Sequence, residues 1–248
     1  MGQGSNGAIH ESPRADVSWT RTPPARALRE AILMVGLGGA MDLYTRRRVL
    51  GHEHLAGLDG PVVFVANHSS HMDTPAILRA LPARWRRRTA VAAATDYFYR
   101  KRRNAHAVSL LFNTVPMERN GGGLEPGATS HVDRLIDEGW SLLVFPEGTR
   151  SRDGTVGRLR SGAAVLAAEH GLPIVPIFIS GTLEVMPPGR RWMRRGLARR
   201  HPIQIRFGEA IRQAAGEERT EVMERVRRFY AEAGAPTTPA EDPRPVSA

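Results

Sequence analysis

The 248 residues are 41% hydrophobic, contain no cysteine and carry a formal net charge of +10. A chain of this length and hydrophobic content can bury one substantial core, as ordinary globular domains do. The lack of cysteine excludes disulfides, a thiolate nucleophile and cysteine-ligated zinc or iron–sulfur centres. The positive charge predicts phosphate-bearing partners, and anionic lipid, nucleic acid and coenzyme thioesters satisfy that demand equally.

Both ends of the sequence are rich in Pro, Ser, Thr and charge. Residues 1–24 and 234–248 are therefore predicted to be disordered tails on a single domain, residues 25–233. No signal peptide is expected, because the first 24 residues lack an apolar central region. The most apolar run, residues 31–41, is well short of the roughly 20 residues that a transmembrane helix needs. We therefore expect a cytoplasmic protein without a transmembrane span.

Apolar strand patterns alternate with helical patterns along this domain. Strand patterns lie at 61–67, 89–94, 141–146, 173–180 and 202–208, and helical patterns at 25–46, 74–81, 126–138, 159–170 and 218–233. Continuous apolar strands separated by helices predict an α/β domain with a largely parallel sheet covered by helices on both faces. In such sheets, ligands bind where strands end and loops begin.

The motif NHSSHMD begins at Asn67, where the first strand pattern ends. A carboxylate five residues after a histidine can hold one ring nitrogen and leave the other free as a base. On this interpretation His68 is the base and Asp73 orients it. The alternative is that Asp73 only caps the helix that begins at Thr74 and Pro75.

The motif FPEGTRS, residues 145–151, lies at the end of a later strand pattern. Gly148 allows close backbone approach, Arg150 offers a planar fork that matches a phosphate, and Thr149 offers a hydroxyl donor. This combination predicts a loop that binds an anionic ligand. The alternative is an ordinary surface loop in which Glu147 and Arg150 are solvated.

With both motifs present, the sequence resembles the glycerolipid acyltransferase family, which includes the 1-acyl-sn-glycerol-3-phosphate (lysophosphatidic acid) acyltransferases. Residues 67–73 match the family's N-H-x4-D block, and residues 145–151 match its F-P-E-G-T-R-S block. VPMER, which ends at Arg119, matches a block in which a strand ends in arginine, and residues 175–177 match a V-P-[IV] block. The order of the blocks agrees across about residues 60–180.

The resemblance implies a glycerol-3-phosphate acyltransferase-like fold, a single α/β domain with a mostly parallel mixed sheet, and O-acyltransferase activity. It implies that His68 and Asp73 are catalytic. The residues expected to hold the phosphate or polar head of the acceptor are Arg119, Glu147, Gly148, Thr149 and Arg150. The expected reaction transfers a fatty-acyl group from acyl-CoA or acyl-carrier protein to lysophosphatidic acid, giving phosphatidic acid, with no cofactor, metal or covalent enzyme intermediate.

This sequence differs from common members of the family at two places, and these differences leave the identity of the acceptor undecided. Residues 160–162 (RSG) stand where many members carry a lysine pair, and residues 121–123 (GGG) closely follow Arg119. Another lysolipid, glycerol phosphate or a specialised alcohol would use the same four blocks.

Basic residues interleaved with tryptophan occur at 84–88 (RWRRR) and 190–201 (RRWMRRGLARRH). This composition favours anionic lipid head groups, although a solvated basic face or a nucleic-acid patch has the same signature. Residues 25–50 fit either an amphipathic helix in the membrane interface or an ordinary core helix. We expect peripheral association with an anionic membrane surface, at the inner face of the cell membrane.

Two further interpretations come from other function classes. His68, His71 and Asp73, with His52 and His54 upstream, have ligand types that suit zinc in a metal-dependent hydrolase, but that interpretation leaves FPEGTRS without a role. A basic nucleic-acid-binding module fits the charge. No recognised motif accompanies the charge and only 6% of residues are aromatic, so we expect no specific nucleic-acid partner.

Overall fold

A computed structural model describes residues 18–94, 102–117, 129–190, 192–194 and 200–236. Residues 1–17 and 237–248, within the predicted tails, lie outside the described residues, as does Arg119. Part of the predicted N-terminal tail is helical, because a short 3-10 helix, η1, covers Ser18–Arg21 and helix α1 starts at Pro23.

The fold is built on a seven-stranded sheet with the order β1-β7-β6-β2-β5-β3-β4. The strands are β1 (Thr45–Leu50), β2 (Val63–Ala66), β3 (Thr89–Ala94), β4 (Thr114–Met117), β5 (Ser141–Val144), β6 (Ile174–Ser180) and β7 (His201–Phe207). The β6–β7 pair is antiparallel, and all the other neighbours are parallel. The predicted single α/β domain with a mostly parallel mixed sheet is therefore confirmed.

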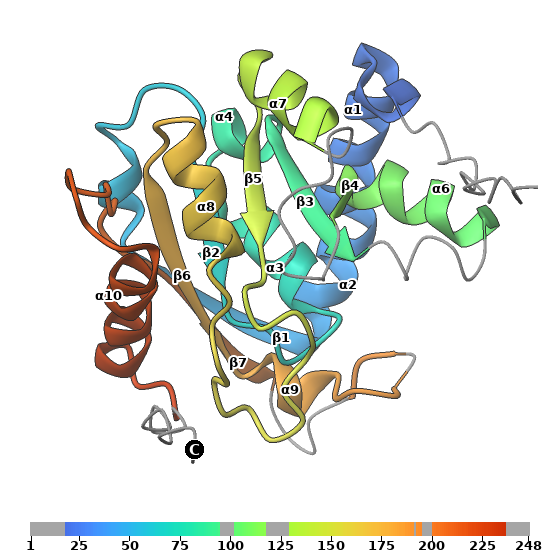
Figure 1. Cartoon of the computed structure of the whole chain (residues 1–248). Helices are drawn as coiled ribbons and strands as arrows, with labels where there is room; N and C mark the ends of the chain where they lie inside the picture. Colours follow the sequence, from blue (N-terminus) through green and yellow to red (C-terminus); the bar gives the residue numbers. More distant parts are fainter. Residues whose placement is uncertain (1–17, 95–101, 118–128, 191, 195–199, 237–248) are drawn as a thin grey trace, which may run out of the picture.

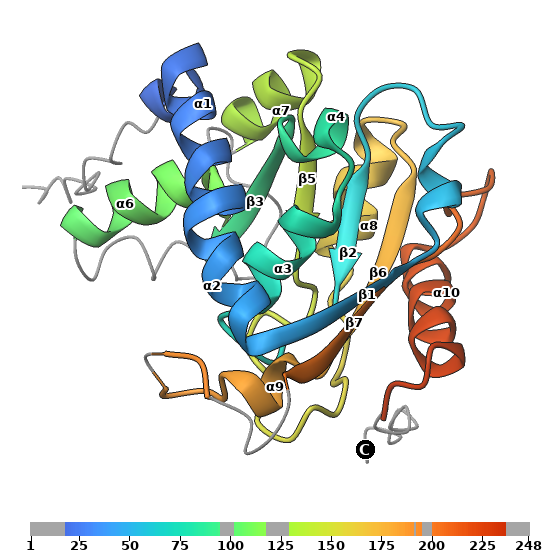
Figure 2. The same ribbon diagram turned by 180° about the vertical axis from the view of Figure 1, so that it is seen from behind.

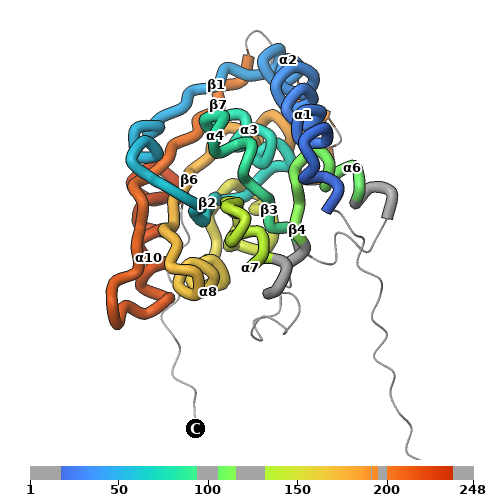
Figure 3. Tube along the Cα trace, turned by 90° about the horizontal axis from the view of Figure 1, so that it is seen from above, coloured from blue at the N-terminus to red at the C-terminus, as the bar shows by residue number. Residues whose placement is uncertain are grey.

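Helices cover both faces of the sheet, as the alternating pattern predicts (Figures 1 and 2). The longer helices are α1 (Pro23–Ala31), α2 (Leu37–Tyr44), α3 (Asp73–Ala80), α6 (Arg102–Phe112), α7 (Thr129–Asp137), α8 (Gly162–Glu169) and α10 (Arg219–Glu232). The short ones are the π-helix η2 (Ile32–Gly36), the 3-10 helix η3 (His52–Leu55), α4 (Ala83–Arg86) and α9 (Thr182–Val185). Figure 3 shows the sheet between α1 to α4 on one side and α7, α8 and α10 on the other.

Two hydrophobic clusters form the core, one on each face of the sheet. Phe64 of β2 belongs to the cluster with Leu33, Met41 and Ile77, and Val65 of the same strand belongs to the cluster with the α7, α8 and α10 side chains. Successive side chains of a strand point to opposite faces, so a strand buried on both faces reads as a continuous apolar run. This is why the central strands were predictable from the sequence.

The first helical segment ends earlier than the sequence predicted. α1, η2 and α2 follow one another without a break, but the helix stops at Tyr44, and residues 45–50 form the edge strand β1 rather than the end of an amphipathic helix. The Thr45 hydroxyl donates to the Met41 carbonyl at 2.8 Å, which satisfies one of the last helical carbonyls. Parallel pairing with β7 then fixes the strand, and this long-range contact has no local signature.

Candidate active site

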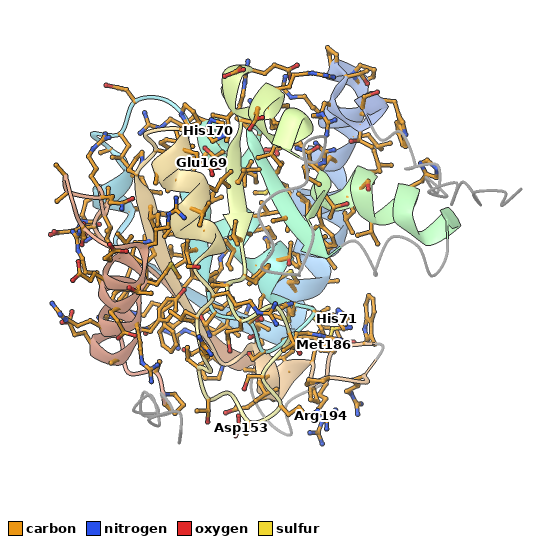
Figure 4. All side chains as sticks on the ribbon, viewed as in Figure 1. His71, Asp153, Glu169, His170, Met186 and Arg194 are labelled. Carbon is orange, nitrogen blue, oxygen red and sulfur yellow. The ribbon has the colours of Figure 1, made fainter. Side chains whose placement is uncertain are left out.

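The two motifs meet at one edge of the sheet. Strands β2, β5 and β6 are parallel neighbours, so the segments that follow them, including residues 67–73 and 145–151, emerge at the same edge. Figure 4 shows His71 and Met186 at this end of the molecule and His170 at the opposite end. The predicted position of the site at the carboxyl ends of the strands therefore agrees with the structure.

His68 and Asp73 form a direct pair. The His68 Nδ1 atom lies 2.8 Å from Asp73 Oδ2, and the Asp73 side chain is fully buried while that of His68 is 19% exposed. The carboxylate already accepts hydrogen bonds from two backbone N–H groups, so it acts as an acceptor and Nδ1 carries the hydrogen. This tautomer leaves the lone pair on Nε2, the atom that a general base uses.

Four donors hold the Asp73 carboxylate. Besides His68, the backbone N–H groups of Ser69 and Ser70 donate to Oδ2 at 2.7 and 2.8 Å, and the Thr182 hydroxyl donates to Oδ1 at 2.5 Å. Asp73 is the first residue of α3, but its side chain reaches back into the preceding turn. The carboxylate therefore organises the histidine turn and does more than cap a helix.

Thr182 is a residue that the sequence analysis missed. It is fully buried, begins α9 two residues after the end of β6 and lies 109 residues from its partner Asp73. A single threonine in a helix-opening position has no pattern of its own. The structure shows that it binds Oδ1 of the carboxylate, whereas the histidine binds Oδ2.

Asn67 fixes the backbone next to His68, and Phe145 packs against the His68 ring. The Asn67 amide donates to the Ile179 carbonyl at 2.9 Å and accepts from the Ile179 N–H at 2.8 Å, so it joins the ends of β2 and β6. The Phe145 ring stacks on the imidazole, with centroids 4.1 Å apart and planes 23° from parallel. The ring of the base is held by neighbours as well as by its carboxylate.

Glu147 joins the two motifs. Its Oε1 accepts from the His68 backbone N–H at 2.9 Å and its Oε2 from the Gly157 N–H at 3.1 Å, while the Ser151 N–H donates to the His68 carbonyl at 2.8 Å. Burial raises the pKa of the Glu147 carboxyl above its ordinary value, and the two backbone hydrogen bonds oppose this rise. One carboxylate oxygen thus supports the backbone at the base and the other supports the loop at Gly157, which the motif alone did not reveal.

The rest of the loop contains one buried donor without a partner among the described residues. Gly148 adopts a left-handed conformation with φ of 68°, and Thr149 is exposed. In the part of the chain that the structure describes, the buried Nη1 of Arg150 has no hydrogen-bond partner. A buried charged donor without a partner costs free energy, so an anion that accepts from Arg150 would be stabilised.

His71 lies within reach of the Arg150 charge. Partial burial lowers the pKa of its imidazole, and the positive charge of Arg150 lowers it further. Of the residues predicted to bind substrate, the structure thus gathers Glu147, Gly148, Thr149 and Arg150 around His68, and the described residues do not include Arg119.

The ligand set of the metal-hydrolase interpretation is not assembled. Among the described residues, no group of three His, Asp or Glu side chains is placed to hold a metal ion. The His52 Nε2 atom lies 2.6 Å from the Ala80 carbonyl oxygen, and its ring stacks on Phe207. This histidine therefore contributes to packing between η3, α3 and β7.

The comparison with known families agrees with the geometry. A family model described as Acyltransferase matches residues 46–180, more than half of the chain. The chain belongs to this acyltransferase family. The match includes His68, Asp73 and the FPEGTRS loop and ends before Thr182 and α10.

Relatives of this acyltransferase domain include two plant enzymes. The chain is 29% identical over 147 residues to a chloroplastic 1-acyl-sn-glycerol-3-phosphate acyltransferase of Brassica napus, covering 57% of this chain and 39% of that protein. It is 31% identical over 140 residues to one of Arabidopsis thaliana, covering 56% and 37%. The chain thus spans less than half the length of these curated relatives.

One solved structure matches most of the chain. The 1-acyl-sn-glycerophosphate (LPA) acyltransferase PlsC of Thermotoga maritima has a TM-score of 0.62 and 25% sequence identity, and the match covers 89% of this chain and 84% of that chain. The match extends well beyond the region of the family model. The sheet order and the helical layers therefore belong to the shared fold.

Proposed function

We propose that this chain transfers a fatty-acyl group from an acyl thioester, acyl-CoA or acyl-carrier protein, to the free hydroxyl of 1-acyl-glycerol-3-phosphate, giving phosphatidic acid. The observation that carries the proposal is the 2.8 Å pair of His68 and Asp73, at the same edge of the sheet as Arg150, whose buried Nη1 is unpaired among the described residues and whose charge acts on the neighbouring His71. A positioned base next to an anion-binding group suits a hydroxyl acceptor that carries a phosphate.

The residues support a direct transfer. Nε2 of His68 takes the proton of the acceptor hydroxyl while the oxygen attacks the thioester carbonyl, and Asp73 stabilises the imidazolium that forms. Collapse of the tetrahedral intermediate breaks the C–S bond, and the leaving thiolate receives the proton from His68. The products are an ester and a free thiol, so atoms and charge balance without a covalent enzyme intermediate.

The experiment measures release of free thiol from palmitoyl-CoA with lysophosphatidic acid and a panel of other acceptors. We expect acceptor-dependent release that falls by roughly 10²- to 10⁴-fold in His68→Ala, because a positioned base contributes about that much. The same assay with palmitoyl-acyl-carrier protein in place of palmitoyl-CoA shows which thioester is the acyl donor. Release that persists in the variant would exclude His68 as the base, and no release with any acceptor or donor would exclude the activity.

A second part of the proposal is peripheral binding to an anionic membrane surface at the inner face of the cell membrane. Within the described residues, no helix is both long enough and apolar enough to cross a bilayer. The contiguous α1, η2 and α2 expose Leu28, Val35 and Leu43, with exposed fractions of 51%, 76% and 63%. Arg46 and Arg48, exposed on the following strand, supply charge that suits anionic lipid.

Sedimentation with vesicles tests this binding. We expect the protein to bind vesicles that contain phosphatidylglycerol more strongly than vesicles of phosphatidylcholine, and the triple variant Leu28→Ser, Val35→Ser, Leu43→Ser to lose most of this binding. Glu224→Ser, an exposed change on α10, is the control. Equal binding by the triple variant and the control would contradict the proposed surface.

A further inference from the structure

Helix α10 lies outside the region that the family model matches, yet one of its side chains reaches the strand that carries the base. Tyr230 is fully buried, and its hydroxyl donates to the Val65 carbonyl of β2 at 2.9 Å. Burial raises the pKa of the Tyr230 phenol well above its ordinary value, and the Glu147 carboxylate adds to the rise. The phenol therefore stays protonated as a donor to β2, the strand that leads into His68.

The chain that follows α10 returns to the loop after β5. The Ala235 N–H donates to the Tyr230 carbonyl at 2.9 Å, and the Pro236 carbonyl accepts from the Val156 N–H at 2.7 Å. Val156 itself is 1% exposed, whereas the loop residues around it are partly or fully exposed. The C-terminal segment thus holds the middle of the loop, while the motif residues hold its start.

The next residue along the loop completes the connection to the base. Gly157 donates its N–H to Oε2 of Glu147, and Oε1 of the same carboxylate accepts from the His68 N–H. Hydrogen bonds therefore link Pro236 to Val156, Gly157 to Glu147, and Glu147 to His68. A shift of the loop at Val156 would change the position of the Glu147 carboxylate and, with it, the backbone of the base.

We infer that Tyr230 and residues 233–236 form a C-terminal clamp that positions Glu147, and through it His68, for the transfer reaction. These residues are positioning residues, since they act through Glu147. The inference rests on the proposed function for its kinetic test, while its structural test is independent of activity.

The clamp matters because the loop is costly to order. Fixing each backbone residue costs about 1 to 2 kcal/mol of conformational entropy, and glycine, present here as Gly154 and Gly157, costs more than other residues. Displacement of a catalytic group by about 1 Å can lower the rate by roughly 10²-fold. A clamp that limits the freedom of the loop therefore affects the chemical step more than substrate binding.

Three forms of the protein test the clamp: the full chain, a chain that ends after Pro236 and a chain that ends after Glu232. The second form keeps every clamp contact described above and is the matched control. We expect the chain that ends after Glu232 to have a kcat lower by about 10- to 100-fold with both KM values within about twofold, because the base is displaced and the binding groups remain. The control is expected to match the full chain.

Amide hydrogen exchange provides the readout that does not depend on turnover. Without the clamp, the amides of Val156, Gly157 and His68 are expected to exchange faster, while those of β2 and β5 keep their protection. Unchanged exchange at these three amides would overturn the clamp even if no acyl transfer were detected. If the full chain has no activity but exchange rises as expected, the proposed function fails and the clamp stands.

The variant Tyr230→Phe tests the clamp if the chain that ends after Glu232 does not fold. This variant removes only the hydroxyl that contacts Val65 and keeps the ring in the core. We expect kcat to fall by a factor of about 3 to 10, in line with loss of one hydrogen bond worth about 1 kcal/mol, with KM unchanged. A KM effect with normal kcat, or no effect on either constant, would overturn the role of Tyr230.

Discussion

The two segments that build the site differ in how their polar groups are partnered. In residues 67–73, the Asn67 amide makes two hydrogen bonds and the Asp73 carboxylate accepts four. In residues 145–151, Glu147 is held on both oxygens, the exposed Thr149 hydroxyl makes one long hydrogen bond of 3.5 Å to the Arg150 carbonyl, and Arg150 keeps a buried nitrogen with no partner among the described residues.

This difference separates two tasks. Groups that must hold a fixed geometry for proton transfer are already partnered by the protein, so their arrangement requires little reorganisation when substrate arrives. The donor best suited to bind an anion, Nη1 of Arg150, has no partner among the described residues, and a donor that is already satisfied would gain little from an anion. Substitutions in residues 67–73 should therefore lower kcat, and substitutions at Arg150 should raise the KM of the acceptor.

The largest effect is expected for Asp73→Asn. Asparagine has the same shape but cannot accept four hydrogen bonds or stabilise an imidazolium, so we expect kcat to fall by roughly 10²- to 10⁴-fold. Asp59→Asn, at an exposed position, is the control for removal of a carboxylate. Steady-state kinetics with acceptor and donor varied in turn provide the measurement. A loss confined to KM would mean that residues 67–73 bind substrate and do not organise the base.

Arg150→Ala tests whether residues 145–151 bind the acceptor. Loss of a hydrogen bond between a guanidinium and a phosphate costs about 1.5 to 3 kcal/mol, so the KM for a phosphate-bearing acceptor should rise by about 10- to 100-fold. An acceptor without phosphate should show little change. Arg152→Ala removes an exposed arginine from the same loop and is expected to leave the KM unaltered. Equal effects of the two substitutions would indicate only a general electrostatic attraction.

Much of the fold was predictable because its central strands are buried on both faces. β2, β5 and β6 appear in the sequence as continuous apolar runs, and each lies within its predicted range. Strand β1 was not predicted, because its sequence TRRRVL lacks a continuous apolar run and resembles the basic end of the preceding helix. Its structure comes from pairing with β7, about 150 residues later in the chain, which no local pattern encodes.

The site, like the fold, has parts that were predictable from local sequence and parts that depend on distant residues. The pairing of His68 with Asp73 was predictable because both residues belong to one turn. The roles of Thr182 and Tyr230 were not, because their partners lie 109 and 165 residues away and contact them only through the packed sheet. The bonds from Glu147 to backbone N–H groups were missed for a related reason, since a motif does not show which backbone groups will lack partners.

Thr182→Val should have a smaller effect than the change at Asp73. Valine has nearly the shape of threonine but removes the donor to Oδ1, while His68, Ser69 and Ser70 still hold Oδ2. We expect kcat to fall by about tenfold, the equivalent of one hydrogen bond to a charged group at the low end of its range, with KM unchanged. Thr182→Ser, which keeps the hydroxyl, should restore most of the activity. If serine were no better than valine, packing and not the hydrogen bond would explain the loss.

The smallest effect expected is that of Glu147→Gln on stability, and it depends on pH. Burial raises the pKa of this carboxyl in the folded protein above its ordinary value of 4.5. Between these two pKa values the folded state binds more protons than the unfolded state, so the contribution of Glu147 to the free energy of unfolding falls as pH rises. Glutamine does not titrate, although its amide leaves one of the two backbone N–H groups without an acceptor.

Urea unfolding of both proteins from pH 4 to 8 measures this dependence. The variant is expected to have the lower free energy of unfolding at pH 4. The difference in free energy of unfolding between the two proteins is expected to narrow as pH rises, by about 1.4 kcal/mol for each unit that separates the folded and unfolded pKa values of Glu147. A difference that widens with pH would mean that the hydrogen bonds from His68 and Gly157 outweigh burial and lower the pKa. In that case Glu147 would stabilise the histidine turn most strongly as an anion. The ionised carboxylate would then belong with the groups that the protein holds in a fixed geometry, and not with the groups that bind a ligand.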